Sequence, residues 1–254
     1  MSNSNILFIV EGEVTEPELI KKMNSVLNIT ETRNVYSYKT SIYELYDVLK
    51  EDKYLDIVLT LKERTSDKRT REMLSRNFVA IYLIFDFEPH YQKFDINKIV
   101  EMRKVFNEST DGGLLLINYP MIEAYKHIKE MPDKEFIDRT VTKKQVKQYK
   151  HLVGEESDYT DLAACHRDII INQMIHHLIK MNYLINGCKA MPNYETVTKM
   201  IHDEEFIKKQ HLHYQDDKLF VLSTVYYYIL ELKPTSFFDE IQLPNIINEL
   251  CTDS

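Results

Sequence analysis

Three acidic residues in the first half of the chain each follow a run of apolar residues. Glu11 comes directly after Ile6–Val10, and Asp86 and Glu88 come at the end of Val79–Phe85. Two carboxylates that project into one cleft repel each other unless a cation or a proton lies between them. Mg²⁺ binds oxygen ligands, typically one or two carboxylates together with phosphate oxygens. The pattern therefore makes Asp86 and Glu88 candidate Mg²⁺ ligands, and the solvated end of a strand is the alternative interpretation.

The apolar runs predict the strands that would position these acids. Five mostly β-preferring residues, Ile6–Val10, are typical of a buried strand, and Glu11-Gly12 would form the turn after it. Thr15 and Glu18 fit a capping box with Thr15 as N-cap, which predicts a helix from that point. Alternation along an extended chain would send the side chains of Asp86 and Glu88 to the same side.

Strands and helices continue to alternate through the first half of the chain. Such an order predicts an α/β fold: a mostly parallel sheet flanked by helices on both faces, with the acids on one rim. The further predicted elements are a strand at 35–40, a helix capped by Ser41, helix within 54–77, a helix capped by Asp95, a strand at 114–117 and a helix from Met121 with Pro120 in its first turn.

The second half of the chain has a different pattern. Apolar residues repeat at helical spacing, most clearly over Asp168–Leu184, and we find no Gly-rich loop or metal-ligand spacing there. We therefore expect two parts, an α/β domain over 1–130 and an α-helical appendage over 131–254.

Three segments of the first half resemble the motifs of Toprim domains. They are VEGEVTEPEL at 10–19, IFDFE at 84–88 and NYPMIEAY at 118–125. The sequences of these three segments most resemble those of the RloB and AbiLii group of Toprim proteins, which are associated with bacterial anti-phage defence. In that group the third motif reads Asn-Pro-x-x-Glu, whereas here Tyr119 is inserted between Asn118 and Pro120.

The resemblance implies roles for particular residues. Glu11 matches the glutamate that binds metal or acts as general acid or base, and Gly12 matches the glycine of the turn. Asp86 matches the first metal-binding aspartate, and Glu88 stands where a second aspartate is usual. Glu123 matches the acid of the third motif, although a helix N-terminus also favours an acid there.

The function implied by the resemblance is Mg²⁺-dependent (or Mn²⁺-dependent) cleavage of phosphodiester bonds in DNA or RNA. A defence effector of this kind would work with a separate ATPase of the ABC or SMC type, since this chain has no GxxxxGK[ST] motif. We also expect that it can pair as a homodimer. His90, two residues after Glu88, is an accessory candidate that could assist proton transfer or contact phosphate, and an exposed loop histidine is the simpler interpretation.

Composition limits the alternatives. The three cysteines (Cys165, Cys188 and Cys251) have no paired spacing, and no apolar run reaches the length of a membrane span, which leads us to expect a cytoplasmic protein. The net charge of −8 is unfavourable for binding nucleic acid. This charge keeps open a non-catalytic Toprim-like scaffold subunit as the second hypothesis. Primase-like nucleotidyl transfer is a third, and no feature requires it.

Overall fold

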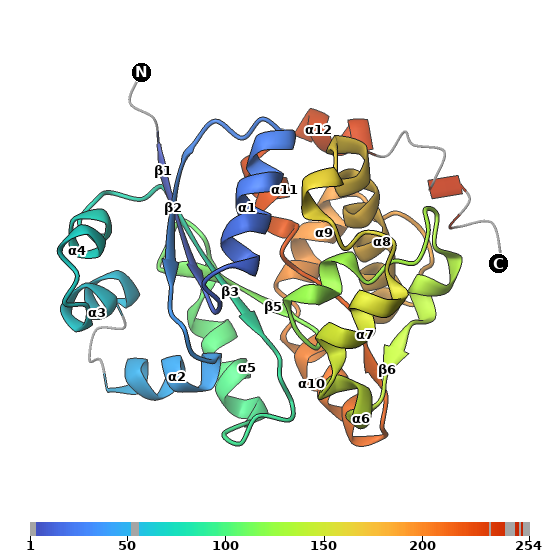
Figure 1. Ribbon diagram of the computed structural model, residues 1–254, viewed down its shortest axis with the longest axis horizontal. Coiled ribbons are helices and arrows are strands. Elements are labelled where there is room, and N and C mark those ends of the chain that lie inside the picture. Colours follow the sequence, from blue (N-terminus) through green and yellow to red (C-terminus); the bar gives the residue numbers. More distant parts are fainter. Residues whose placement is uncertain (1–3, 52–55, 234, 242–246, 249, 251–254) are drawn as a thin grey trace.

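A five-stranded sheet lies at the centre of the first half of the chain (Figure 1). The computed structural model describes residues 4–51, 56–233, 235–241, 247–248 and 250. The strand order is β2-β1-β3-β5-β4, and all neighbours are parallel except the short β4, which is antiparallel to β5. This arrangement confirms the predicted mostly parallel sheet. The strands are β1 Asn5–Val10, β2 Thr32–Ser37, β3 Ala80–Asp86, β4 Asn107–Glu108 and β5 Gly113–Asn118.

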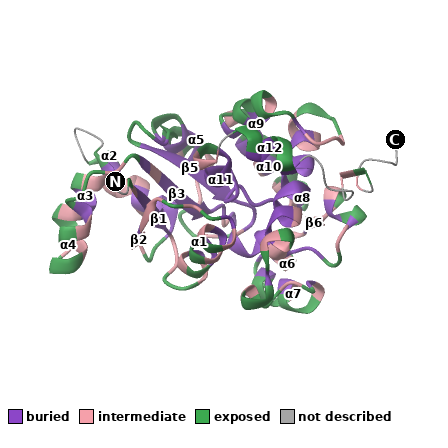
Figure 2. Ribbon diagram, turned by 90° about the horizontal axis from the view of Figure 1, so that it is seen from above, coloured by how far each residue is buried: buried purple, intermediate pink, exposed green. Residues whose placement is uncertain are grey.

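Helices cover both faces of this sheet. Seen from above, α1 lies on one side of the strands and α5 on the other (Figure 2). The central strands β1, β3 and β5 are buried along almost their whole length, as expected for a parallel sheet between two helical layers. The helices of this half are α1 Thr15–Val26, α2 Ile42–Lys50, α3 Ile57–Arg64, α4 Lys68–Leu74 and α5 Ile96–Val105.

Two predicted helix caps are wrong in detail. Helix α1 begins at Thr15, so Val14 occupies the N-cap position and no side chain bonds there. Ser41 does precede α2 as its N-cap, but its hydroxyl makes no cap hydrogen bond. In contrast, the Asp95 carboxylate accepts a hydrogen bond from the Asn97 amide at the start of α5, as predicted. The apolar pattern therefore predicted where these helices lie more accurately than it predicted which side chains cap them.

The segment after β5 also differs from the prediction. Instead of a helix from Met121, the chain forms a single 3₁₀ segment, η1 Ile122–Lys126. The Tyr119-Pro120 peptide is cis, and Tyr119 pairs with Leu222 through two backbone hydrogen bonds. This pairing holds the backbone extended beyond β5, so a helix cannot begin at Pro120.

The second half is mostly helical, as predicted, and its longest element is α8. This helix is buried on almost all sides, and it includes the predicted 168–184 helix. An unpredicted two-stranded antiparallel sheet, β6-β7, accompanies the helices. The elements are η2 Lys134–Asp138, β6 Thr140–Val141, α6 Lys143–Val146, α7 Tyr149–Glu156, η3 Leu162–Ala164, α8 Arg167–Asn186, α9 Tyr194–Ile201, α10 Glu204–Gln215, β7 Leu219–Phe220, α11 Tyr227–Leu232 and α12 Thr235–Ile241.

The two halves share side-chain contacts at the sheet. The Tyr228 ring of α11 lies 5.0 Å from the Phe8 ring of β1 and 5.7 Å from the Tyr82 ring of β3, between ring centroids. The boundary near residue 130 stays a prediction. Within the described part of the chain, no helix is both long and apolar enough to cross a membrane. Cys165 is buried and Cys188 is exposed, and Cys251 lies outside the described residues.

Candidate metal centre

Strand register brings the first acid to the second. Val10 pairs with Ile84, and the Glu11 amide continues the ladder by donating to the Ile84 carbonyl at 3.2 Å. The Asp86 amide in turn donates to Glu11 Oε2, also at 3.2 Å. The carboxyl ends of β1 and β3 therefore place Glu11 and Asp86 side by side.

Glu11, Asp86 and Glu88 come together at this rim. One carboxylate oxygen from each lies within 4.8 Å of the other two. Two oxygen ligands of one octahedral Mg²⁺ lie at most about 4.2 Å apart, since each Mg–O distance is about 2.1 Å. The three carboxylates can therefore reach a common ion with small side-chain movements.

Glu88 reaches its place by a route that the sequence analysis did not predict. Strand β3 ends at Asp86, and Glu88 has a φ of +36°, which is outside extended backbone. Its amide donates to the Pro120 carbonyl at 3.1 Å, which holds the turn against the end of β5. Asp86 and Glu88 thus face the same site because the chain turns, and simple alternation along a strand is not the cause.

The opposite side of this turn is apolar. The Phe87 ring is fully buried between the rings of Phe94 and Tyr119, and its carbonyl accepts a hydrogen bond from the Tyr43 hydroxyl at 2.5 Å. Tyr119 therefore has a role in packing beneath the acidic residues. The packing of Phe87 against Tyr119 and Phe94 anchors the turn that carries Glu88.

The carboxylates are electrostatically unfavourable to one another. Burial, the Glu88 charge and the Glu16 charge raise the pKa of Glu11 to about 8, against the opposing effect of the Asp86 amide. Burial first, and then the surrounding acids, raise the pKa of Asp86 well above its ordinary value. Burial and the Glu123 charge raise the pKa of Glu88. A divalent cation would remove this repulsion, because it favours the charged form of every ligand.

Glu16 is a member of the cluster that the sequence analysis missed. It is buried in the first turn of α1, and its carboxylate accepts a hydrogen bond of 2.8 Å from the Gly12 amide. Burial is the main cause of its raised pKa, and the Glu123 charge adds to it. A Cβ atom on Gly12 would lie 2.5 Å from Glu16 Oε2, so glycine leaves room for this carboxylate. The sequence offers only a weak hint of this position, an acid in the first turn of the helix predicted from Thr15, and acids are common there without a site.

Glu123, the third-motif candidate, also lies near these carboxylates. It is buried in η1, and its charge raises the pKa of Asp86, Glu88 and Glu16. Lys150 Nζ lies 3.6 Å from Glu123 Oε1. We call Glu11, Glu16, Asp86, Glu88 and Glu123 the acidic cluster.

His90 lies in the loop after Glu88. The residue is exposed, and desolvation of the ring, together with the Lys147 charge, lowers its pKa. Among the described residues no hydrogen bond joins His90 to the acidic cluster, so an accessory role for it stays a prediction.

Two buried polar atoms at the strand ends lack partners within the described part of the chain. They are Asp86 Oδ1 and Asn118 Nδ2, on residues that pair directly across β3 and β5. Asp86 is 8% exposed and Asn118 is fully buried. A buried carboxylate oxygen without a donor is costly, and an ion bound by the acidic cluster would satisfy it. The donor set, all carboxylate oxygens, also suits a hard divalent cation such as Mg²⁺.

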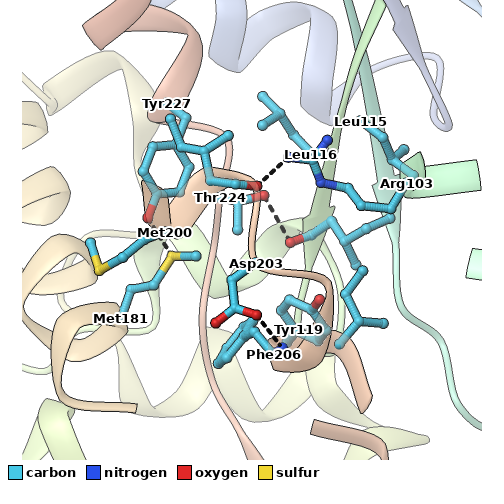
Figure 3. A pocket seen from close by; sticks show the side chains of 13 residues that line it. Arg103, Leu115, Leu116, Tyr119, Met181, Met200, Asp203, Phe206, Thr224 and Tyr227 are labelled. Atoms are coloured by element: carbon cyan, nitrogen blue, oxygen red, sulfur yellow. Dashed lines mark hydrogen bonds between the residues drawn. The ribbon is translucent and has the colours of Figure 1, made fainter. Parts of the chain in front are cut away.

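A small, partly open cavity elsewhere does not compete with this site. It lies beside Arg103, between β5 and the α9–α10 junction (Figure 3), and its volume is about 30 Å³. This is enough for a water molecule and too small for a substrate. Asp203, at its edge, already accepts a hydrogen bond from the Phe206 amide at the start of α10. The cavity is therefore part of the packing between α5 and α10.

Comparison of the chain with protein-family models, with curated proteins and with solved structures found no match.

Proposed function

We propose that this protein is a Mg²⁺-dependent nuclease of the Toprim type that hydrolyses phosphodiester bonds of DNA or RNA. The supporting observation is the convergence of Glu11, Asp86 and Glu88, whose carboxylate oxygens lie within 4.8 Å of one another. The unpartnered Oδ1 of buried Asp86 is a second observation in favour of a bound cation. The motif order and its resemblance to RloB and AbiLii proteins supply the reaction class.

The proposal assigns roles to the residues of the site. Asp86 and Glu88 would hold the ion, and a bound Mg²⁺ polarises a phosphate and lowers the pKa of a bound water. Glu11 would complete the ligand set for the ion. Its pKa of about 8 applies to the site without a cation, because a bound cation favours the charged carboxylate. Gly12 orients Glu16 through its amide, which keeps that carboxylate in the cluster.

The direct test is cleavage by purified protein. Labelled DNA and RNA are incubated with Mg²⁺, Mn²⁺ or EDTA, and the products are separated on a denaturing gel. We expect metal-dependent cleavage that falls by at least about a hundredfold in Glu11→Gln and Asp86→Asn, the scale on which removing one catalytic group acts. Glu13→Gln is the matched control. Glu13 is two residues after Glu11, but it is exposed and forms an ion pair with Lys39. Activity that survives both cluster substitutions would exclude this site.

A non-catalytic Toprim-like scaffold is the second candidate. The net charge of −8 and the glutamate at position 88, where an aspartate is usual, favour it. Calorimetric titration with Mg²⁺ separates the two hypotheses. A catalytic centre should bind the ion and lose that binding in Glu88→Gln, whereas a pure scaffold should show no such loss.

The biological setting is a further part of the proposal, supported by the resemblance alone. We propose an effector of anti-phage defence that acts with a separate ABC- or SMC-type ATPase and that can form a homodimer. Expression of wild type and Glu11→Ala in bacteria, with growth and nucleic-acid integrity as readouts, tests whether the protein acts as an effector. Damage to nucleic acid by both proteins alike would contradict it.

A further inference from the structure

A lysine, Lys150, lies at the edge of the acidic cluster. Lys150 lies in the first turn of α7, which packs against η1, the segment that carries Glu123. Its side chain is 77% exposed, whereas that of its partner Glu123 is 6% exposed. The ammonium group therefore lies where a buried acidic site meets solvent.

The Lys150–Glu123 pair differs from an ordinary surface ion pair. At 3.6 Å, its nitrogen and oxygen are beyond hydrogen-bond distance, so the ammonium hydrogens can donate to another acceptor. By comparison, Lys199 and Glu195 on α9 are both exposed and lie 2.7 Å apart, in direct hydrogen-bond contact. Lys150 also acts on Glu16, whose pKa its charge lowers. One lysine thus faces two acids of the cluster without being bound closely to either.

Positive charge continues along the same edge. Lys147 precedes α7 and is exposed, and its charge acts on His90, which follows Glu88. Lys147 therefore lies near the loop after β3, and it is three residues before Lys150 in the chain. The chain as a whole has a net charge of −8, which repels a polyanion.

A polynucleotide approaching this site needs cations beside the metal as well as at it. An ion held by the cluster neutralises the carboxylates at the reaction centre, but the neighbouring phosphates still face an acidic protein. Lysine binds phosphate as a point charge and reaches it with a flexible stem. A phosphate oxygen within reach of Lys150 would offer the ammonium a closer partner than Glu123 does.

We propose that Lys150 binds a phosphate oxygen of the polynucleotide next to the scissile bond, exchanging its contact with Glu123 for the substrate. This inference rests on the proposed function, because it assigns the substrate contact of the same site. It makes Lys150 a substrate-positioning residue and α7 the element that presents the edge of the site to the nucleic acid. Lys147 is expected to add to the same field with a smaller effect.

The test measures binding separately from cleavage. Short fluorescent DNA and RNA strands are titrated in Ca²⁺, an oxygen-binding ion larger than Mg²⁺, and anisotropy is followed at several salt concentrations. We expect Lys150→Ala to weaken binding about fivefold to tenfold and to lower the salt slope by about 0.7 to 0.9, the value for one phosphate contact. Lys150→Arg should retain most of the binding. In cleavage assays with Mg²⁺, Lys150→Ala should raise KM more than it lowers kcat.

Lys199→Ala is the matched control, since it removes an equally exposed lysine from a Lys–Glu pair remote in sequence from the cluster. It should change neither the affinity nor the salt slope. Thermal unfolding and Mn²⁺ titration of each variant show whether folding and the metal centre are intact. Loss of Mn²⁺ binding in Lys150→Ala would overturn the inference, because the lysine would then act by placing Glu123.

The remaining outcomes distinguish the inference from the proposed function. If wild type binds Mn²⁺ and cleaves, but Lys150→Ala binds nucleic acid with unchanged affinity and salt slope, only the inference fails. If neither DNA nor RNA binds to wild type, the inference also fails. If wild type does not cleave, but Lys150→Ala still lowers the salt slope, the nuclease proposal fails, and of the inference only a phosphate contact of Lys150 without a scissile bond remains.

Discussion

At the scale of single residues, Asp86 is repelled by every other member of the acidic cluster. The charges of Glu11, Glu16, Glu123 and Glu88 all raise its pKa, in addition to the dominant effect of burial. Its Oδ1 has no hydrogen-bond partner among the described residues. The ionised residue is therefore a source of instability without metal and a favourable ligand with it.

The substitution Asp86→Asn should consequently have opposite effects with and without metal. In EDTA near neutral pH, we expect the free energy of unfolding to rise by about 1 to 3 kcal/mol, because the folded chain no longer has to bury a charged carboxylate or to protonate it. Wild type should gain about 2.7 kcal/mol at a Mg²⁺ concentration of one hundred times Kd, and the variant should gain little. Urea unfolding with and without Mg²⁺ measures both effects. A variant that is less stable than wild type in EDTA would contradict the argument.

The acids of the cluster were only partly predictable from the sequence. Glu11, Asp86 and Glu88 could be identified because each follows a run of apolar residues that predicts a strand, and parallel strands end at one edge. Glu16 could not, because its place depends on the hydrogen bond to Gly12 and on a helix that starts at Thr15 without a side-chain cap. Lys150 lies 27 residues after Glu123 in the chain, and only the packing of α7 against η1 joins them.

At the scale of elements, a buried histidine joins η1 to α7. His127 is 1% exposed, and its Nδ1 lies 2.9 Å from the Tyr149 hydroxyl and its Nε2 lies 3.0 Å from Glu156 Oε2. Tyr149 and Glu156 are the first and last residues of α7. The contact fixes the helix that carries Lys150 against the segment that carries Glu123.

This histidine should make stability depend on pH. Burial is the main cause that lowers the pKa of His127 from 6.5 to about 4. Between these values the unfolded chain binds a proton that the folded chain does not, so the free energy of unfolding falls as pH falls, by about 3 kcal/mol in total. Above pH 6.5 this contribution is complete.

The carboxylates oppose this trend, because the Glu11 pKa of about 8 favours the folded state as pH falls from 8 toward 4.5. The measurement is therefore the difference between wild type and His127→Gln in urea unfolding over this range in EDTA. We expect the variant to lose less stability than wild type between pH 6.5 and about 4. Parallel pH profiles for the two proteins would show that His127 does not titrate as argued.

An element could be predicted from the sequence when its run or repeat of apolar residues was long. The buried strands and α8 have long apolar patterns and were predicted within a few residues. The prediction of a helix after Pro120 was wrong because Tyr119 pairs with Leu222. The two residues are about a hundred positions apart in sequence, so no local pattern can reveal this contact. The short strands β6 and β7 lie about 80 residues apart in sequence and were not predicted for the same reason.

At the scale of the whole molecule, the helical half completes the core of the sheet. The fully buried Tyr228 ring lies against Phe8 and Tyr82, and its hydroxyl donates to Asn24 Oδ1 of α1 at 2.8 Å. Near the site, the Ser223 hydroxyl donates to Asn118 Oδ1 at 2.7 Å. The strands that position the acids are therefore supported by residues from the far end of the chain.

Truncating Tyr228 should destabilise the whole protein. We expect Tyr228→Ala to cost about 3 to 5 kcal/mol, the usual effect of removing a buried aromatic ring. The control Tyr228→Phe loses only the hydrogen bond to Asn24 and should cost about 1 kcal/mol. Urea unfolding should show one transition in both variants, since the halves share contacts. Two separate transitions, with only the later part of the chain affected, would mean that the halves fold independently.

The central claim is that Glu11, Asp86 and Glu88 hold one divalent cation, and Mn²⁺ binding tests it most directly. Electron paramagnetic resonance measures free Mn²⁺ during a titration of wild type, of each single amide variant of these acids, and of the Glu13→Gln control. We predict saturable binding by wild type and the control, and at least about a tenfold loss in each cluster variant. Wild-type protein that binds no Mn²⁺, or cluster variants that bind it as tightly as wild type does, would contradict the account.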